Sequence, residues 1–212
     1  MPYRITESHP KCSGFAVVKK DGGKLMGCHK SKAKARAQLT ALNLDEAGPG
    51  YKGDAVFGPS GRIILQDLNV ALSSNFKEMP KHRPMSKFVQ EVEEYRSWLI
   101  ELLKHEYVIL CTARSVIYED MTLERIKSLT GWQPNEVCFN PWEDPSGKGA
   151  LRAHRAKARY LKEVIMPRHG DDPSMYFAIE SNKFSRSMYK ANDIECRDAN
   201  RDDSQPWKTL LP

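Results

Sequence analysis

Short apolar runs alternate with longer segments of helical periodicity through most of the sequence, and this alternation limits the choice of fold more than any other feature. Each run is rich in branched and aromatic residues, as strands buried on both faces are. We expect strands over residues 62–67, 107–111, 136–139, 175–179 and 194–196, and helices over 86–105, 122–129, 150–165 and 185–191. Strands that alternate with helices in this way are typical of a doubly wound α/β domain with a parallel sheet, which we place at residues 58–212.

The helix over 86–105 has the clearest periodicity of the four. Its apolar residues recur at spacings of four and three, at Phe88, Val92, Tyr95, Leu99 and Leu102. This spacing predicts one continuous amphipathic helix. The helix over 122–129 is followed by Gly131, a residue that commonly ends helices.

Polar side chains stand at the carboxyl ends of the predicted strands, where ligands bind in sheets of this kind. The first strand ends at Asp67, the second at Thr112 and the fourth at Glu180, and the helix before the fourth strand carries Lys157. An aspartate can attack phosphorus, a hydroxyl and a lysine can hold the phosphoryl oxygens, and a second acid can help to hold a hard divalent cation. This set of groups favours phosphoryl transfer through an aspartyl-phosphate.

Two sequence motifs that contain these positions resemble motifs of a known family. The first is Val108-Ile-Leu-Cys-Thr112-Ala-Arg114, an apolar strand that ends in a hydroxyl residue and an arginine. The second begins at Lys157, continues to Pro167 and ends with the acidic end of the next strand, Glu180-Ser181. With these motifs, residues 62–199 resemble the HAD superfamily, and most closely the 3′-phosphatase domain of bacteriophage polynucleotide kinases.

The resemblance implies a HAD-like Rossmannoid three-layer sandwich with a parallel sheet and a minimal cap. It implies that the catalytic positions are Asp67, Asn69, Thr112 and Lys157, with Lys162 as the alternative lysine, and that Mg²⁺ is held by Asp67, Asn69 and Glu180. We expect substrate contacts from Arg114, which the resemblance places beside the site, and from Arg152 and Arg155 of the basic helix. The interval between Asp67 and Thr112 is too short for an independent cap domain, so we expect an open site that suits large substrates such as nucleic-acid ends.

The first motif departs from the family pattern. Where the family has Asp-x-Asp-Gly-Thr, this chain has Asp67-Leu-Asn69-Val70-Ala71, so the second aspartate, the general acid/base, is an amide. An amide cannot exchange a proton with the leaving group or with water, and general acid/base catalysis is worth about 10²–10⁴-fold in rate. In the last motif Ser181 replaces a second acid. We therefore expect a site that binds metal and phosphate but turns over slowly.

A small basic ββα unit is predicted at residues 1–46, followed by a Gly/Pro-rich linker at 47–57. Its strands lie over 14–20 and 24–29, joined by a turn at Asp21-Gly22-Gly23, and its helix lies over 32–44. Residues 1–50 hold nine Lys/Arg and four Asp/Glu, so most of the chain's net charge of +6 is here. This charge favours a nucleic-acid partner, although solvation alone also accounts for it. Residues 12–43 weakly resemble a segment of phage head-assembly and protease proteins, which implies a phage structural partner for this unit.

The five cysteines are odd in number and widely spaced, and we expect them to be reduced. His9, Cys12, Cys28 and His29 have the chemistry of zinc ligands, but the neighbours Cys28 and His29 point to opposite faces of a strand, so packing is favoured over a metal site. No apolar run is long enough to span a membrane. We expect a protein of the cell interior: the host cytoplasm if it is phage-encoded, or a virion.

Two functional hypotheses follow. The first is a Mg²⁺-dependent phosphatase for nucleic-acid 3′ ends or nucleotides, impaired at Asn69. The second is a catalytically degenerate module that binds nucleic acid or serves phage-particle assembly. A HAD-like enzyme of another chemistry stays open as a third. Gly147-Lys148-Gly149 lacks the spacing of a P-loop, so we expect no kinase half.

Overall fold

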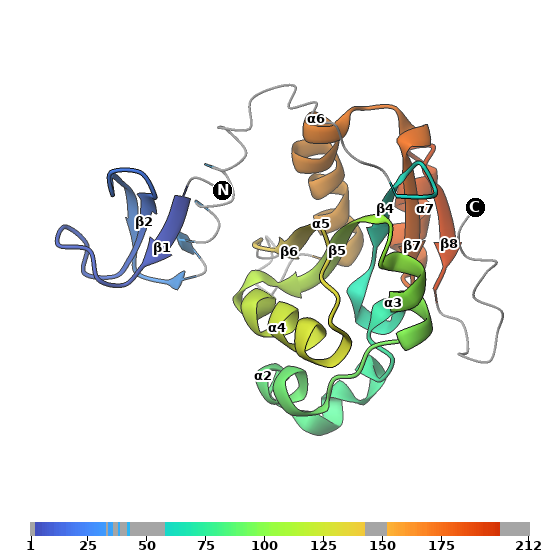
Figure 1. The fold of residues 1–212 in the computed structure, drawn as a ribbon, viewed down its shortest axis with the longest axis horizontal. Helices are drawn as coiled ribbons and strands as arrows, with labels where there is room; N and C mark the ends of the chain where they lie inside the picture. The colour runs from blue at the N-terminus through green and yellow to red at the C-terminus, as the bar shows by residue number, and fades with distance from the viewer. Residues whose placement is uncertain are drawn as a thin grey trace.

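A computed structural model describes residues 3–32, 34, 35, 38, 42, 58–142 and 152–199. These residues form two separate sheets (Figure 1). The small sheet consists of β1 (Tyr3–Thr6), β2 (Phe15–Lys19) and β3 (Leu25–His29), and the large sheet of β4 (Ile63–Gln66), β5 (Tyr107–Ser115), β6 (Glu136–Asn140), β7 (Tyr176–Glu180) and β8 (Glu195–Asp198). Among the described residues, no helix is both long and apolar enough to cross a membrane.

The large sheet is parallel throughout and has the strand order β6-β5-β4-β7-β8. β4 is therefore the central strand, and the chain leaves it in one direction to form β5 and β6 and returns on its other side to form β7 and β8. This order is that of a Rossmann-type sheet, whose ligands bind beside the central strand where the strand order reverses. The predicted α/β class and the parallel sheet are confirmed.

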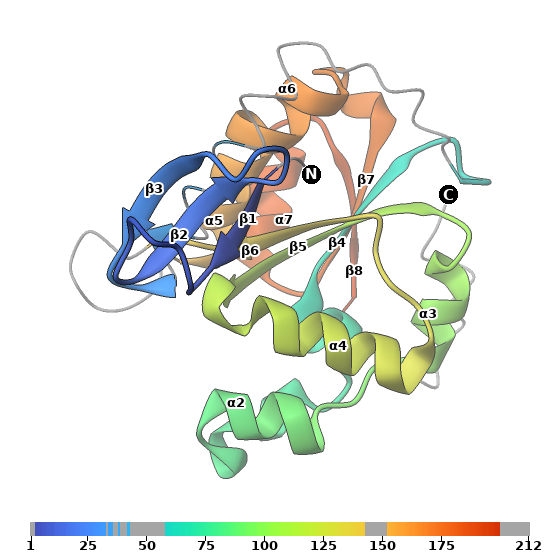
Figure 2. The ribbon, with the colours of Figure 1, turned by 60° about the vertical axis from the view of Figure 1, so that its left-hand side comes forward.

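Helices cover both faces of the large sheet, because alternate side chains of each buried strand point to opposite faces. Ile63 and Leu65 face α5 (Ala153–Tyr160), η5 (Leu161–Ile165) and α7 (Lys183–Lys190), while Ile64 faces α3 (Ser97–Leu103) and α4 (Glu119–Thr130). Figure 2 shows the sheet nearly edge-on between these two layers. The remaining short helical segments are η1 (Leu68–Leu72), η2 (Phe76–His82), α2 (Met85–Lys87), η3 (Phe88–Val92), η4 (Val116–Tyr118), α6 (Met166–His169) and η6 (Pro173–Met175).

The prediction of one continuous helix over 86–105 is wrong. The chain is helical up to Val92, becomes extended at Glu93, and is helical again from Ser97. Tyr95 makes an antiparallel bridge to Ser73, and the side chain of Asn75 bonds both the Val92 carbonyl (2.9 Å) and the Glu94 amide (3.0 Å). These contacts come from a distant part of the chain, and they replace the helical hydrogen bonds that the local spacing predicts.

The other predicted helices are present with different ends. α4 extends beyond 122–129 at its start and ends at Gly131, whose φ of 69° is left-handed as predicted for a helix terminator. The helix predicted over 150–165 continues through η5 into α6, and its first two residues lie outside the described part of the chain. The helix predicted over 185–191 begins two residues earlier, at Lys183.

The N-terminal unit has one strand more than predicted. β1 pairs with β2, so the sheet is a three-stranded antiparallel one. Gly22 and Gly23 both have positive φ, as the predicted turn requires. Lys32, Lys34, Ala35, Gln38 and Leu42 are helical, and the other residues of the predicted helix, like the linker at 47–57, lie outside the described residues.

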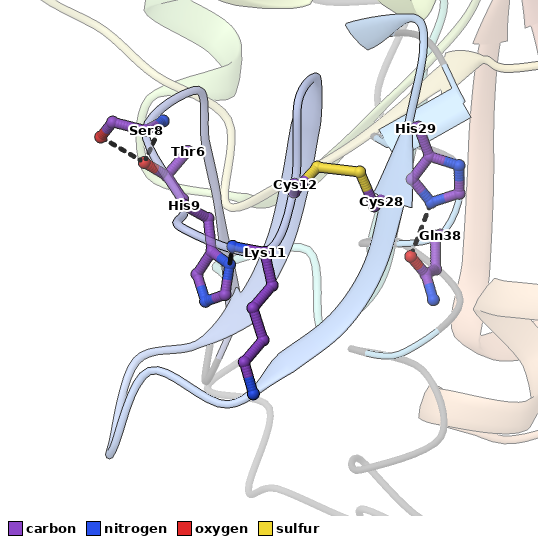
Figure 3. The surroundings of a disulfide bond; sticks show 8 residues. All are labelled: Thr6, Ser8, His9, Lys11, Cys12, Cys28, His29 and Gln38. Atoms are coloured by element: carbon purple, nitrogen blue, oxygen red, sulfur yellow. Dashed lines mark hydrogen bonds between the residues drawn. A yellow bond between two sulfur atoms is a disulfide. The ribbon is translucent and has the colours of Figure 1, made fainter.

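The expectation of five reduced cysteines is wrong for one pair, because Cys12 and Cys28 form a disulfide (Figure 3). Cys111, Cys138 and Cys196 are free thiols, as expected. The segment after β1 turns back through the His9–Cys12 bridge, which brings Cys12 to β3. Sequence spacing does not encode this return of the chain.

The disulfide also bears on the zinc site considered for His9, Cys12, Cys28 and His29. Both sulfur atoms are used, and the two histidines have other partners: His29 bonds Gln38 (2.7 Å), and Nδ1 of His9 accepts from the Lys11 amide (3.2 Å) (Figure 3). Figure 3 shows Cys28 and His29 on opposite sides of β3, as the alternation along a strand predicts. Within the described parts of the chain, no three His, Cys, Asp or Glu residues form a group that could hold a metal ion.

Candidate functional site

The candidate site lies at the carboxyl edge of the large sheet, directly after its central strand. The amide of Asp67 donates to the Ile179 carbonyl (2.9 Å), so this carboxylate is fixed between β4 and β7. Asp67 is 5% exposed. The central strand thus delivers a nearly buried carboxylate to the point where the strand order reverses.

The turn after Asp67 has a strained backbone. Val70 has a φ of 68°, a left-handed value at the position where the family pattern has glycine. A β-branched residue in this region is a conformational outlier that costs on the order of 1–3 kcal/mol. Nη1 of Arg96 donates to the carbonyls of both Val70 and Ala71 at 2.6 Å, and these bonds hold the turn.

Lys157 connects the two acids that the sequence predicts. Its ammonium lies 2.6 Å from Asp67 Oδ1 and 2.5 Å from Glu180 Oε2, and only 2% of the residue is exposed. Burial disfavours the ammonium, but the negative charges of Asp67 and Glu180 outweigh burial and raise the pKa of Lys157 above its usual value. Lys162, the alternative lysine, is exposed on η5, so Lys157 is the lysine of the site.

Glu180 is a buried acid with a raised pKa. Burial, together with the charge of Asp67, raises the pKa of Glu180 to about 7, although Lys157 opposes this shift. Its second oxygen, Oε1, accepts from the Asn182 amide at 2.8 Å. Both oxygens of Glu180 therefore have partners within the protein.

Ser181 takes part in the site, which the sequence analysis did not expect. Its hydroxyl lies 2.7 Å from Asp67 Oδ2 and 3.0 Å from the Asn69 carbonyl oxygen. In an octahedral Mg²⁺ site with bonds of about 2.1 Å, neighbouring ligand oxygens are about 3 Å apart. The oxygens of Asp67, Asn69 and Ser181 are thus of the type that Mg²⁺ binds, and the Ser181 hydroxyl stands about that far from each of the other two, whereas Glu180 faces Lys157. The signal available in the sequence was that Ser181 directly follows a strand-end acid.

Arg114 is buried beside Asn69. It is 3% exposed, and its guanidinium donates to Glu93 (2.8 and 2.5 Å), Thr122 (3.0 Å) and the side-chain oxygen of Asn69 (2.9 Å). The two terminal nitrogens of its guanidinium are thus used inside the protein, and the substrate contact expected from this residue stays a prediction. Arg114 fixes the amide of Asn69, and Glu93, which the sequence analysis missed, fixes Arg114.

Thr112 lies beside Asp67 on the neighbouring strand. Gln66 pairs with Leu110, so Thr112 stands one residue nearer to the carboxyl edge than the position level with Asp67. Its Oγ1 accepts from the Arg114 amide (3.1 Å), and a hydroxyl with that acceptor role can still donate its hydrogen to a ligand.

The basic helix presents its charges around the site rather than in it. Arg152 is the residue before the first turn of α5, Arg155 lies in that turn, and both are exposed. They are available to a ligand that extends beyond the buried carboxylates. The structure therefore brings together Asp67, Asn69, Thr112, Lys157, Ser181 and Glu180, and leaves Arg152 and Arg155 at the rim.

The site combines a buried carboxylate with a cation and two hydroxyls. Asp67 supplies a carboxylate, Lys157 a positive charge, and Thr112 and Ser181 hydroxyls. The side chain at Asn69 is an amide, so this position supplies no proton. No protein-family model and no curated protein matches the chain.

Proposed function

We propose that the protein hydrolyses phosphomonoesters of nucleic-acid 3′ ends or nucleotides through an aspartyl-phosphate at Asp67, and that it does so slowly. The observation that carries the proposal is the bridge of Lys157 between Asp67 and Glu180 at the end of the central strand. A carboxylate held against a buried ammonium is oriented for attack, and the same ammonium can stabilise a phosphoryl oxygen in the transition state.

The first chemical step forms one bond and breaks another. A carboxylate oxygen of Asp67 attacks phosphorus, and the ester oxygen leaves with the electron pair of its bond to phosphorus. Lys157 and Thr112 hold the phosphoryl oxygens. The leaving oxygen takes its proton from water, since Asn69 has none to give, and this lack costs about 10²–10⁴-fold in rate. Water then attacks phosphorus, releases inorganic phosphate and restores the carboxylate of Asp67.

The charge of the site explains why a cation is expected. With Asp67 and Glu180 ionised and Lys157 protonated, the three side chains sum to one negative charge, which repels a phosphate. Mg²⁺ at the oxygens of Asp67, Asn69 and Ser181 would supply the missing positive charge. Protonation of Glu180, whose pKa is about 7, also removes one negative charge and so weakens the repulsion of a phosphate.

The test is phosphate release from a 3′-phosphorylated oligonucleotide and from an aryl phosphate in the presence of Mg²⁺. We expect slow turnover by the wild type, none by Asp67→Asn, and faster turnover by Asn69→Asp, which restores an acid. Circular dichroism of each variant provides the control for folding. If all three folded proteins are silent, the phosphatase proposal is overturned.

One observation favours a second candidate, a degenerate module that binds phosphate without hydrolysing it. The side chain of Asn69 accepts a hydrogen bond from Arg114 within a buried ion pair, so this position serves packing rather than proton transfer. For such a module, inorganic phosphate binds to the wild type but Asn69→Asp gains no turnover. Nucleic acid is then a ligand, and the basic unit at residues 1–46 is a further contact for it or for a phage particle in the host cytoplasm or the virion.

A further inference from the structure

The rim of the candidate site carries exposed apolar side chains. Among the described residues, three large hydrophobic side chains are about half exposed or more: Ile117 (49%), Leu129 (49%) and Phe184 (58%). Single exposed hydrophobic residues are common on protein surfaces and by themselves indicate nothing. Their positions are informative here, because Ile117 follows the carboxyl end of β5 and Phe184 follows that of β7. These two strands flank β4, so both side chains belong to the edge that holds Asp67.

Phe184 is the more exposed of the two, and its backbone is firmly held. It stands in the first turn of α7, and its amide donates to the side chain of Asn182 (2.9 Å). Arg186 donates to the Ser181 carbonyl (2.7 Å) and ties the same turn to the site. Only two residues separate Phe184 from Ser181, whose hydroxyl contacts Asp67. The ring is thus mounted on a rigid turn that is continuous with the site.

The surroundings of the ring are aromatic and cationic. The His154 ring lies 5.8 Å from the Phe184 ring, and the Lys183 ammonium lies 5.1 Å from its centroid. His154 stands one helical turn before Lys157, so the same face of α5 carries a residue of the site and the partner of Phe184. Arg152 and Arg155 add exposed positive charge at the start of this helix.

An exposed ring among cations beside a phosphate site matches one class of ligand. Aromatic side chains stack on nucleobases, and neighbouring Lys and Arg side chains neutralise the phosphate backbone. We propose that Phe184 is a stacking platform for the base of the nucleotide whose phosphate enters the Asp67 site, so that the ligand is a single-stranded nucleic-acid end. This inference rests on the proposed function and narrows its substrate class.

The proposal is tested by binding in an Asp67→Asn background, in which no probe is hydrolysed. The probes are a fluorescent 3′-phosphorylated trinucleotide and the same molecule with an abasic 3′-terminal nucleotide, measured by fluorescence polarisation. We expect Phe184→Ala to weaken binding of the first probe by about 5- to 150-fold, and to change binding of the abasic probe by no more than about twofold. Phe184→Trp keeps a ring and should retain the affinity. Leu129→Ala, an equally apolar change at the far end of α4, is the matched control and should have no effect.

The two proposals fail in different ways. If the parent protein binds both probes equally, or if Phe184→Ala weakens both equally, the stacking platform is overturned. Competition by inorganic phosphate reports on the phosphate site alone, so a lack of competition contradicts the proposed function. If neither probe binds, both proposals fall.

Discussion

The ammonium of Lys157 keeps two buried carboxylates from repelling each other. Asp67 and Glu180 both contact it, and all three side chains are almost completely shielded from water. Removal of one member of a buried ionic group leaves an uncompensated buried charge. The resulting loss of folding free energy is larger than the net stability that the intact group contributes. The residues of the site are therefore also residues on which the stability of the fold depends.

We expect Lys157→Met to lower the free energy of unfolding by about 3–5 kcal/mol, because it leaves Asp67 and Glu180 without their cation. Urea denaturation measures this loss. The matched control is Lys162→Met on the exposed side of the neighbouring turn, where we expect a change within about 0.5 kcal/mol. Equal losses in the two variants would contradict the role given to Lys157.

The raised pKa of Glu180 predicts a pH dependence of stability. The pKa is about 7 in the folded protein and 4.5 in the unfolded reference, so between these values the native state holds a proton that the unfolded state has released. The contribution of this group to the free energy of unfolding therefore falls as the pH rises from about 4.5 to about 7, and is constant above that. Glu180→Gln removes the titration. Urea midpoints measured against pH should show the wild type losing stability relative to this variant within that interval, and a constant difference would refute the assignment.

At the level of elements, the Glu93–Arg114 pair joins the break after η3 to the end of β5. Both side chains are fully buried. We expect Arg114→Met to cost about 3–5 kcal/mol, since it leaves the carboxylate of Glu93 unpaired. The double variant Arg114→Met/Glu93→Met should be more stable than Arg114→Met alone, because no buried charge remains. Urea unfolding of the single and double variants measures the difference, and additive losses would show that the pair is not coupled.

The same pair shows where the sequence is informative and where it is not. The strands could be predicted because a strand buried on both faces must be apolar along its length, as Ile63–Leu65 are. The break at Glu93 could not be predicted, because the apolar spacing continues through it and the extended backbone depends on contacts with residues 73–75. The apolar spacing indicates which face of the segment is buried. It carries no information on hydrogen bonds to residues far away in the sequence, such as Asn75.

The residues of the candidate site also fall into those that the sequence predicts and those that it does not. Asp67 and Lys157 could be predicted from strand ends and from a family resemblance, because each keeps its expected residue type. Ser181 and Glu93 were missed because their roles depend on where other groups stand: Ser181 on two oxygens of the β4 turn, and Glu93 on Arg114. The Cys12–Cys28 pairing was missed for the same reason, since it depends on how the chain returns after β1.

For the whole molecule, the disulfide predicts that the two sheets respond differently to reduction. Its cysteines are 16 residues apart, a loop for which closure is worth about 3 kcal/mol. We expect reductant, or the double variant Cys12→Ser/Cys28→Ser, to speed hydrogen exchange in β1–β3. A reductant leaves the free thiols of the large sheet unchanged, so exchange in β4–β8 is the internal control. Unchanged exchange in β1–β3 would refute this prediction.

The central position of β4 has a consequence for how the chain acquires its structure during synthesis. β4 pairs on one side with residues 107–110 and on the other with residues 176–179. While the ribosome has not yet released the second of these segments, one edge of the strand that carries Asp67 has no partner. Pairings between segments so far apart in the chain form slowly. The candidate site, which contains both Asp67 and Glu180, can thus be assembled only after β7 has emerged, and a chain that ends before β7 should expose a bare apolar edge of β4.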